Sequence, residues 1–586
     1  MQYYKEYIYN NSNNTTNDYG KLSFIENDFY VNNIKVINNR GIINDDVYIL
    51  KNEVIGIKER MISNIVGILY LDSKIKYGNI KNKSLYLFKS TNKDYPNFYV
   101  PYNNNKNCKI YCIIQFKEWK ISDKLPIGNL IEVLGDVGNK EVEFEHLRNY
   151  FNIRNSIWKI DNDKKNNDIQ ILNSLQNKVE DYSVFSIDPF GSKDIDDAFH
   201  FKLIDNNSFE IGIHIASPIN FFENDLLNIM DRVSTIYTPI KNYNLLPSFY
   251  SDNLISLLEN EKRFAISLII QVNNNIIISY EIKESVVKNI KNYCYEDFDK
   301  EFNKRLNKKY HETDNYIKNM LDFLNYSREF HKIEMIDSHK LVEYWMITAN
   351  KIIANHLINK KVANVIVRVH KSSLIDMNNN NLKEELSKYI INRNEKSATY
   401  QIYDTEIKDN YQKHSKLDND YYTHFTSPIR RAVDFYIHML ILNKENRIEK
   451  DNLKKILEKI NLFTKNSRRF DRNMKRLDLL YKIKETDKNI ITSAYIIKIS
   501  NYKLTLYIPE YNLEEKIIII PKKFENISNS NILKDEYENI IKIEYTIDDK
   551  YRVYNLYDNI VIKIWIFTSF DNIFDKIKIE ILSNNL

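Results

Sequence analysis

Four aspartates stand within ten residues of one another about a third of the way along the chain: Asp188, Asp194, Asp196 and Asp197. Two unit charges about 4 Å apart repel by roughly 4 kcal/mol near a protein surface, so the fold must separate these carboxylates or place a cation among them. The segments 182–185 and 198–201 have the pattern of strands, which would put Asp194 and Asp196 on one face and Asp197 at the turn beyond. Carboxylate oxygens gathered in this way suit Mg²⁺, with Mn²⁺ as the alternative.

An exposed acidic turn is the other interpretation of the four aspartates. A calcium-binding EF-hand loop is excluded, because a loop starting at Asp194 would place Phe199 where the turn needs glycine and Asp205 where the last ligand should be glutamate. The choice between a metal site and an exposed turn therefore depends on a second motif further along the chain.

The second motif reads Tyr-Thr-His-Phe-Thr-Ser-Pro-Ile-Arg-Arg and ends at Arg431. Ser427 suits the N-cap of a helix and Pro428 its first position, so the sequence predicts a helix that begins here with two arginines in its first turn. A helix start that carries two guanidinium groups is suited to binding phosphate. Asp434 lies four residues after Arg430 and is predicted to hold that guanidinium in place.

Together the two motifs closely resemble the catalytic signatures of the RNase II/RNase R family, the RNB-domain exoribonucleases. Both the aspartate spacing and the run Thr-Ser-Pro-Ile-Arg-Arg agree with the family pattern. The resemblance covers nearly the whole chain and is nearest the exosome-associated eukaryotic branch. Shorter matching stretches are Ile213–Ala216, Ser234–Tyr237, Leu246-Pro247, Ser256-Leu257, Arg263, Glu343-Tyr344 and Ala349-Asn350.

The resemblance implies roles for particular residues. The catalytic set would be Asp188, Asp194, Asp196, Asp197 and Arg430. The four aspartates would hold one or two Mg²⁺ ions, and Arg430 would stabilise charge on the scissile phosphate. Tyr237 would stack on the terminal base of the RNA, although a tyrosine in a core is the alternative. Arg431 and His370 are expected to contact the RNA.

The sequence departs from the family pattern after His370. The run Arg368-Val369-His370 keeps the Arg-x-His of the family, but Lys371-Ser372-Ser373 stands where the family usually has prolines or an aromatic residue. One half of the family's terminal-base clamp is therefore in doubt, and Tyr237 matches the other half.

Composition and net charge limit where RNA can bind and in which compartment the protein is expected. The net charge of +5 is small for 586 residues, so RNA must bind at a local patch or channel. Cys108, Cys112 and Cys294 form neither a metal-ligand pattern nor a disulfide framework, which fits a reducing compartment. Since the sequence has neither a membrane-spanning apolar run nor a signal peptide, we expect a cytoplasmic protein without a membrane partner, and the nucleus is not excluded.

The resemblance and the strand patterns predict a multidomain α+β fold. It comprises two N-terminal cold-shock-type OB β-barrels, a central mixed α+β RNB catalytic domain and a C-terminal S1-type OB β-barrel. The expected boundaries are 1–19 for a disordered lead, 20–78 and 79–150 for the two cold-shock domains, 151–180 for a linker, 181–487 for the catalytic domain and 488–586 for the S1-type domain. Eukaryotic members often carry a PIN-type endonuclease domain ahead of the first barrel, and we expect none here.

Two elements of the central domain are predicted in detail. Asn273-Asn274-Asn275 should join strands at 266–272 and 276–282 in a hairpin. A helix is expected over Leu341–Leu357, with apolar residues such as Trp345 on one stripe that faces a core.

By resemblance, the chain is expected to be a metal-dependent hydrolytic 3′→5′ exoribonuclease that degrades single-stranded RNA to nucleoside 5′-monophosphates. We expect a monomer that acts alone or in a larger RNA-decay assembly. One rival is a catalytically silent RNA-binding protein on the same scaffold, whose expected signature, loss of one of the aspartates, is absent here. A metal-stabilised β-rich adaptor that binds protein is the other rival, and it would leave the pairing of the two motifs unexplained.

Overall fold

The computed structural model divides into two compact units. A terminal unit joins Met1–Ile153 to Asn466–Leu586, and a central unit contains Arg154–Lys465. The structure describes residues 18–584 except for 26–27, 39, 61–62, 104–106, 121, 154–157, 175–178, 239–241, 304, 306–314, 334–336, 372–381, 395–396, 408–410, 445–447, 487, 501–502, 520–527, 536–538, 548–549, 568–570 and 572. Most of the predicted disordered lead lies outside these residues, but Asp18 and Tyr19 already belong to the first strand.

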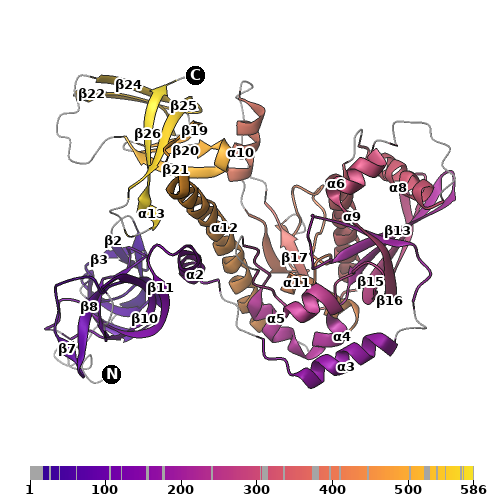
Figure 1. The fold of residues 1–586 in the computed structure, drawn as a ribbon, viewed down its shortest axis with the longest axis horizontal. Helices are drawn as coiled ribbons and strands as arrows, with labels where there is room; N and C mark the ends of the chain where they lie inside the picture. The colour runs from indigo at the N-terminus through magenta and orange to yellow at the C-terminus, as the bar shows by residue number, and fades with distance from the viewer. Residues whose placement is uncertain are drawn as a thin grey trace. The chain divides into compact units, whose positions relative to one another are not determined.

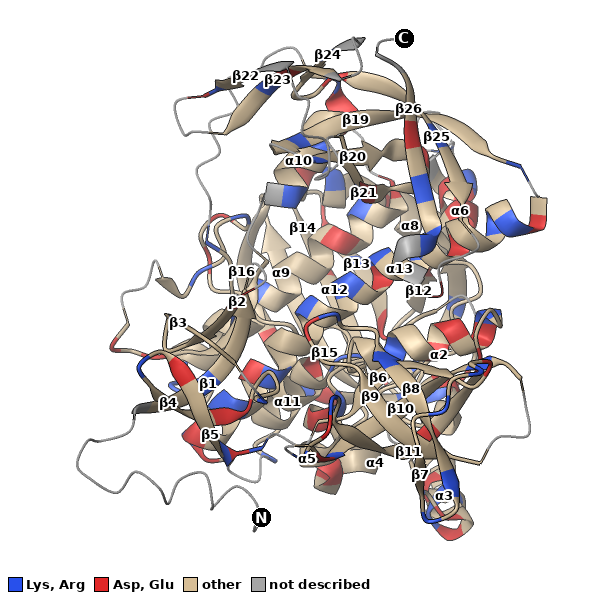
Figure 2. Ribbon diagram, turned by 90° about the vertical axis from the view of Figure 1, so that its left-hand side faces the viewer, with Lys and Arg blue, Asp and Glu red and all other residues tan. Residues whose placement is uncertain are grey.

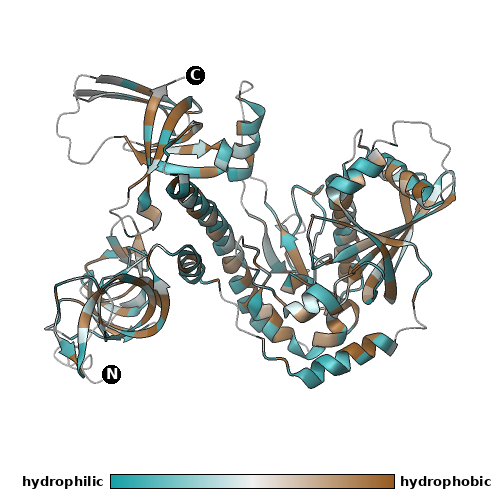
Figure 3. Ribbon diagram, in the orientation of Figure 1, coloured by the Kyte–Doolittle hydropathy of each residue, from teal (hydrophilic) through white to brown (hydrophobic). Residues whose placement is uncertain are grey.

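The first sheet of the terminal unit has the strand order β3-β2-β1-β4-β5 (Figure 1). Its strands are β1 (Asp18–Ile25), β2 (Asp28–Val31), β3 (Ile34–Val36), β4 (Asp46–Leu50) and β5 (Glu53–Glu59). Because side chains alternate across a strand, one face supplies the core, in which Leu22, Val31 and Val47 meet. Figure 3 shows hydrophobic and hydrophilic residues alternating along such strands.

The second sheet has the order β6-β10-β11-β9-β8-β7, and helix α2 (Lys140–Tyr150) follows it. Its strands are β6 (Ile65–Tyr70), β7 (Asn79–Ile80), β8 (Lys83–Ser90), β9 (Phe98–Tyr102), β10 (Lys109–Glu118) and β11 (Ile127–Asp136). The predicted boundary between residues 78 and 79 is wrong, because β6 pairs with both β10 and β8. Leu69 of β6 lies in the same core as Phe88 and Ile114, so the second domain includes this strand.

The C-terminal part of the terminal unit contains a five-stranded sheet in the order β21-β20-β19-β25-β26. Its strands are β19 (Ile490–Ser500), β20 (Lys503–Ile508), β21 (Leu513–Ile518), β25 (Asn559–Ile566) and β26 (Ile577–Asn584). A three-stranded sheet, β22 (Ser528–Lys534), β23 (Ile540–Ile547) and β24 (Lys550–Asn555), accompanies it. The first sheet, the second sheet and the C-terminal pair of sheets correspond to the three predicted OB-type domains.

The central unit is built on a closed barrel of strands β12-β13-β14-β15-β16. These are β12 (Val184–Asp188), β13 (Asp197–Asp205), β14 (Ser208–Ala216), β15 (Lys262–Asn273) and β16 (Ile276–Cys294). The predicted hairpin is confirmed, since Asn273 pairs with Ile276 across the turn. Asn274 and Asn275 both adopt positive φ angles, 49° and 58°, which a two-residue hairpin turn favours.

Helices cover the barrel of the central unit (Figure 1). They include α8 (Asn315–His331), which packs on β13, and α9 (Ser338–Asn359), which packs on α8. The predicted helix at Leu341–Leu357 is confirmed within α9, and Trp345 is buried on its inward stripe. Helix α11 (Ala432–Ile441) is almost wholly buried, as its nearly continuous apolar sequence requires. Helix α12 (Lys450–Thr486) starts in the central unit and ends in the terminal unit.

The segment predicted as a linker, 151–180, carries a helix of its own. It contains helix α3 (Asn162–Asn173), whose N-cap Asp161 accepts a hydrogen bond from the backbone N–H of Lys164 at 2.7 Å. Leu172 of α3 packs in the core of the central unit, and this burial gives the short polar helix its tertiary support.

Charge is spread over the whole chain. Figure 2 shows lysines and arginines interspersed with acidic residues along the elements, as the small net charge of +5 requires. Among the described helices, none combines the length and the apolar character that crossing a membrane demands.

Candidate active site

Two adjacent strand ends of the central barrel carry the outer members of the aspartate cluster. Asp188 is the last residue of β12, and Asp197 is the first of the neighbouring antiparallel strand β13. Asp194 and Asp196 lie in the loop between the two strands, so the prediction that they share one face of a strand is wrong. The loop is held by hydrogen bonds from outside the strand ladder, among them one from the N–H of Ala216 to the carbonyl of Asp196 at 2.8 Å.

Asp196 joins the aspartate cluster to the arginine motif. Its side chain is buried, and one carboxylate oxygen accepts a hydrogen bond from the backbone N–H of Ile429 at 2.9 Å. The other oxygen accepts from Nε of Arg430 at 3.0 Å. Two motifs more than 230 residues apart in sequence therefore form one site.

The local structure around Arg430 differs from the prediction. Helix α11 begins at Ala432, and residues 428–430 form a turn before it, so Ser427 is not its N-cap. Ser427 instead accepts a hydrogen bond through its hydroxyl from Nη2 of Arg430 at 3.0 Å. The guanidinium is thus held by Asp196 and Ser427, each through a different N–H group.

The prediction that Asp434 holds Arg430 is also wrong. One oxygen of the buried Asp434 carboxylate accepts from the backbone N–H of Ser427 and from Nη2 of Arg431, both at 2.8 Å. The segment before α11 is not helical, so spacing by four residues does not bring side chains together there. Arg431 is thus bound to a buried partner. Arg430, whose side chain is 42% exposed, lies at the surface of the site.

Tyr237 lies beside the cluster and donates a hydrogen bond from its hydroxyl to a carboxylate oxygen of Asp194. The tyrosine is 47% exposed, so it is not a core residue. Partial burial and the neighbouring Asp194 carboxylate raise the pKa of Tyr237, which keeps the phenol protonated as a donor. The structure thus places an exposed ring next to one of the predicted metal ligands.

Burial opposes the negative charge of the carboxylates. Burial, together with the Asp197 charge, raises the pKa of Asp188 well above its usual value. Burial raises the pKa of Asp196 to about 8, although Arg430 opposes the rise, and it raises the pKa of Asp197 to about 6. Oδ2 of Asp188 has no hydrogen-bond partner among the described residues. Burial raises the pKa of Tyr295, and the nearby negative charges of Asp197 and Asp188 raise it further.

This arrangement fits a divalent cation. All the donors are carboxylate oxygens, which Mg²⁺ and Mn²⁺ prefer, and one buried oxygen is unsatisfied. As the side chains lie, no three His, Cys, Asp or Glu residues of the described ranges converge on one point closely enough to hold a metal. Asp188, Asp194 and Asp197 would have to draw together around the ion.

The other two predicted RNA-binding residues have protein partners. Arg431 forms an ion pair with Asp434, and His370 is buried, with Nδ1 2.6 Å from the hydroxyl of Ser415. The ring of His370 stacks on His414 with centroids 5.1 Å apart. Contact of either residue with RNA stays a prediction. The serines of the altered segment after Lys371 lie outside the described residues.

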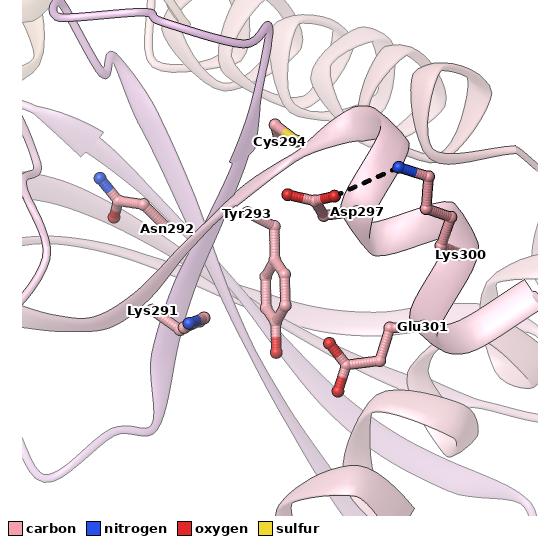
Figure 4. A pocket seen from close by; sticks show the side chains of 7 residues that line it. All are labelled: Lys291, Asn292, Tyr293, Cys294, Asp297, Lys300 and Glu301. Carbon is pink, nitrogen blue, oxygen red and sulfur yellow. Dashed lines mark ion pairs between the residues drawn. The ribbon is translucent and has the colours of Figure 1, made fainter.

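Sequence reasoning missed Tyr295 as a neighbour of the carboxylates. It follows β16, and only the parallel pairing of Asp188 with Cys294 places it near the site. A cavity of about 450 Å³ opens at the same end of β16, lined by residues such as Tyr293 and Cys294 (Figure 4). Asp297 and Lys300 also line it and form an ion pair at 3.6 Å. None of the four aspartates lines the cavity, so it is separate from the candidate site.

A buried histidine behind the arginine motif gives a prediction on stability. Nε2 of His438 lies 2.9 Å from the carbonyl of Phe425, and burial lowers the pKa of His438 to about 3. A folded pKa below the unfolded value of about 6.5 gives a contribution that is complete above pH 6.5 and is lost as the pH falls. The free energy of unfolding of the wild type should therefore fall relative to that of His438→Gln by about 2 kcal/mol between pH 7 and pH 5. Denaturant titrations of both proteins at the two pH values measure this, and a difference that does not change with pH would contradict it.

Family comparisons agree with the geometry of the site. Residues 176–333 and 327–447 match the RNB domain, and residues 85–149 match the Dis3-like cold-shock domain 2. The second match confirms the predicted likeness of the second barrel to the eukaryotic branch.

Related sequences include bacterial ribonuclease R and eukaryotic exosome exonucleases. Ribonuclease R of Chlamydia pneumoniae is 25% identical over 500 residues, which cover 72% of this chain and 72% of that protein. Exosome complex exonuclease RRP44 of Homo sapiens is 24% identical over 559 residues, which cover 81% of this chain and 54% of the human protein. Similar identities to both proteins do not single out one branch.

Solved structures share the fold. The apo form of Mycoplasma genitalium RNase R matches with a TM-score of 0.71 at 18% identity, over 96% of this chain and all of that one. The same protein has been solved with ribose-methylated single-stranded RNA and with double-stranded RNA. Yeast Ssd1, described as a pseudonuclease, matches with a TM-score of 0.65 at 14% identity, over 97% of this chain and 96% of that one. Both catalytic motifs lie inside the matched RNB domain and meet in one site, so the chain belongs to the RNB-domain family of 3′→5′ exoribonucleases.

Proposed function

We propose that this chain is an active, divalent-metal-dependent exoribonuclease that degrades single-stranded RNA from its 3′ end to nucleoside 5′-monophosphates. The contact between Asp196 and Arg430 is the observation that carries the proposal. It places a partly exposed guanidinium beside a group of carboxylates whose raised pKa values call for a cation. A phosphodiester that enters this site would meet the guanidinium of Arg430 and a metal ion held by the carboxylates. Both positive groups stabilise the negative charge that develops in phosphoryl transfer.

Each residue has a task in this proposal. Asp188, Asp194 and Asp197 would hold Mg²⁺, or Mn²⁺ in its place, which supplies Lewis-acid polarisation of the phosphate and activation of water. Asp196 is the fourth predicted ligand, and it also orients Arg430 through Nε. Because Asp196 and Ser427 engage Nε and Nη2, the remaining edge of the guanidinium is free to donate to a non-bridging phosphate oxygen.

The second candidate function is a catalytically silent RNA-binding protein, and the likeness to the pseudonuclease fold of Ssd1 favours it. Fold likeness alone cannot decide between the two, because one scaffold can carry an active or an inactive site. Retention of all four aspartates, together with the bond from Asp196 to Arg430, supports the active enzyme.

A cleavage assay tests the proposed function. Single-stranded RNA labelled at its 5′ end should be shortened progressively from the 3′ end in Mg²⁺, and EDTA should stop the reaction. Chromatography of uniformly labelled products should show nucleoside 5′-monophosphates. A circular RNA of the same sequence is the control and should stay intact. Binding of the linear RNA without any shortening would support the silent protein instead.

Tyr237 should act in two separable ways. The side chain is half-exposed, so its ring can stack on a base, while the hydroxyl orients Asp194. Tyr237→Phe keeps the ring, so the KM for RNA should stay within about twofold and kcat should fall modestly. Tyr237→Ala loses base stacking worth about 1–3 kcal/mol, so KM should rise by roughly 5- to 150-fold. Steady-state kinetics on one oligonucleotide compare the variants, and equal KM values for both would exclude stacking.

The proposed partner is single-stranded RNA, and we propose a cytoplasmic monomer that acts alone or within a larger RNA-decay assembly. All three cysteines are free, as a reducing compartment allows. Size-exclusion chromatography with light scattering tests the monomer, and a dimeric mass at micromolar concentration would contradict it.

A further inference from the structure

We propose that Ser256 is a positioning residue that fixes the backbone on both sides of Asp194 and so holds the aspartate loop ready for its cation. Ser256 lies about 60 residues from this loop in the sequence and is completely buried. Residues 192–196 belong to no strand or helix, so their conformation depends on contacts of this kind. The inference rests on the proposed function, because it assigns Ser256 a task in that same site.

The hydroxyl of Ser256 makes two hydrogen bonds to the loop. It accepts from the backbone N–H of Ile195 at 2.9 Å and donates to the carbonyl of Lys193 at 2.7 Å. These two groups belong to the residues immediately before and after Asp194. One side chain therefore fixes both peptide groups that set the direction of the Asp194 side chain.

Neighbouring residues hold Ser256 itself. The backbone N–H of Leu257 donates to the carbonyl of Ile195 at 3.1 Å, which adds a third bond to the loop. Nε of the buried Arg263, on β15, lies 3.1 Å from the carbonyl of Ser256 and 3.1 Å from that of Asn253. A barrel strand thus supports Ser256, and Ser256 supports the loop.

The aspartate loop needs this support because Asp194 lies near other negatively charged side chains. Asp194 is partly buried, and its carboxylate accepts a hydrogen bond from Tyr237, which is itself half-exposed. Repulsion from Asp196 and Asp197 favours a loop conformation that moves the carboxylates apart. Loss of the Ser256 hydroxyl would leave the N–H of Ile195 and the carbonyl of Lys193 without these bonds in a buried position, so the loop would shift to find other partners.

Two substitutions of Ser256 distinguish the effect of its hydroxyl group from the effect of its packing. Ser256→Ala removes both hydrogen bonds, and Ser256→Thr keeps a hydroxyl at the same position. Ser327→Ala is the matched control, because Ser327 is also a buried serine that accepts a hydrogen bond at 3.0 Å, from Trp345 Nε1, and it does not touch the loop. Both alanine variants should lose similar thermal stability.

The readouts are Mn²⁺ affinity by electron paramagnetic resonance without RNA, and kcat and KM for RNA cleavage. Groups that orient metal ligands typically contribute 10- to 100-fold to affinity or activity. We expect Ser256→Ala to weaken Mn²⁺ binding and to lower kcat by factors in that range, with KM within twofold of the wild type. Ser256→Thr should recover most of both, and Ser327→Ala should change neither.

The outcomes separate this inference from the proposed function. Equal Mn²⁺ affinity in Ser256→Ala and Ser327→Ala would overturn the role of Ser256, even if the wild type cleaves RNA. Weaker Mn²⁺ binding in Ser256→Ala with an inactive wild type would support the positioning role and overturn the proposed nuclease. If Ser256→Ala does not fold, Ser256→Cys, which keeps the size but bonds weakly, takes its place and must show the same loss.

Discussion

Asp188→Asn is expected to lower the single-turnover rate of RNA cleavage by at least about 10²- to 10³-fold, the usual cost of removing one group that stabilises transition-state charge. The substitution keeps the shape of the side chain and removes one negative charge. Oδ2 of Asp188 has no partner among the described residues, so the amide that replaces it disturbs no bond there. Asp196→Asn would be a less specific test, because Asp196 also holds Ile429 and Arg430.

RNA binding should respond differently from cleavage. Carboxylates repel phosphates, so Asp188→Asn should bind RNA as tightly as the wild type or slightly more tightly. Fluorescence anisotropy with a labelled oligonucleotide in EDTA measures this affinity, and quenched-flow mixing measures the single turnover. Cleavage at the wild-type rate would mean that the aspartates form only an acidic turn.

The same variant should change stability in a direction that depends on pH. The folded pKa of Asp188 is raised above its unfolded value, so the carboxyl contributes stability at acid pH that is lost as the pH rises through the folded pKa. In EDTA, Asp188→Asn should therefore gain melting temperature relative to the wild type as the pH rises. Mg²⁺ should raise the melting temperature of the wild type more than that of the variant. A metal effect of equal size in both would exclude Asp188 as a ligand.

Arg430→Lys is expected to reduce kcat by about 10²- to 10³-fold with little change in RNA affinity. A lysine keeps the charge but cannot reproduce the planar group in which Nε bonds Asp196 and Nη2 bonds Ser427. In the proposed function the remaining edge of this group donates to the phosphate. The aimed donor would become a mobile ammonium group. Single-turnover rates and anisotropy on the same RNA separate the two effects.

Arg431→Lys is the matched control for this prediction. The side chain of Arg431 is committed to the buried carboxylate of Asp434, so its replacement should lower the melting temperature and affect turnover much less. A rate loss in Arg431→Lys as large as that in Arg430→Lys would show that the wrong guanidinium has been assigned to the phosphate.

Local sequence signals accounted for the regular elements of the fold. The hairpin turn at Asn273–Asn275 and the apolar stripe of α9 could be predicted because each depends on residues that are close in sequence. The boundary between the first two barrels could not, because β6 belongs to the second sheet only through its pairing with β10 and β8. Strand partners are long-range contacts that periodicity does not specify.

In the candidate site, too, some features could be predicted from the sequence and others depended on the tertiary structure. The identity of the four aspartates and the presence of two arginines after Pro428 were evident in the sequence by itself, together with the family to which they point. The spacing of four residues wrongly suggested that Asp434 holds Arg430, since it assumed a helix that begins only at Ala432. Tertiary structure decided that Asp196 holds Arg430 and that Ser256 holds the loop around Asp194, because burial forces polar groups that are distant in the sequence to satisfy one another.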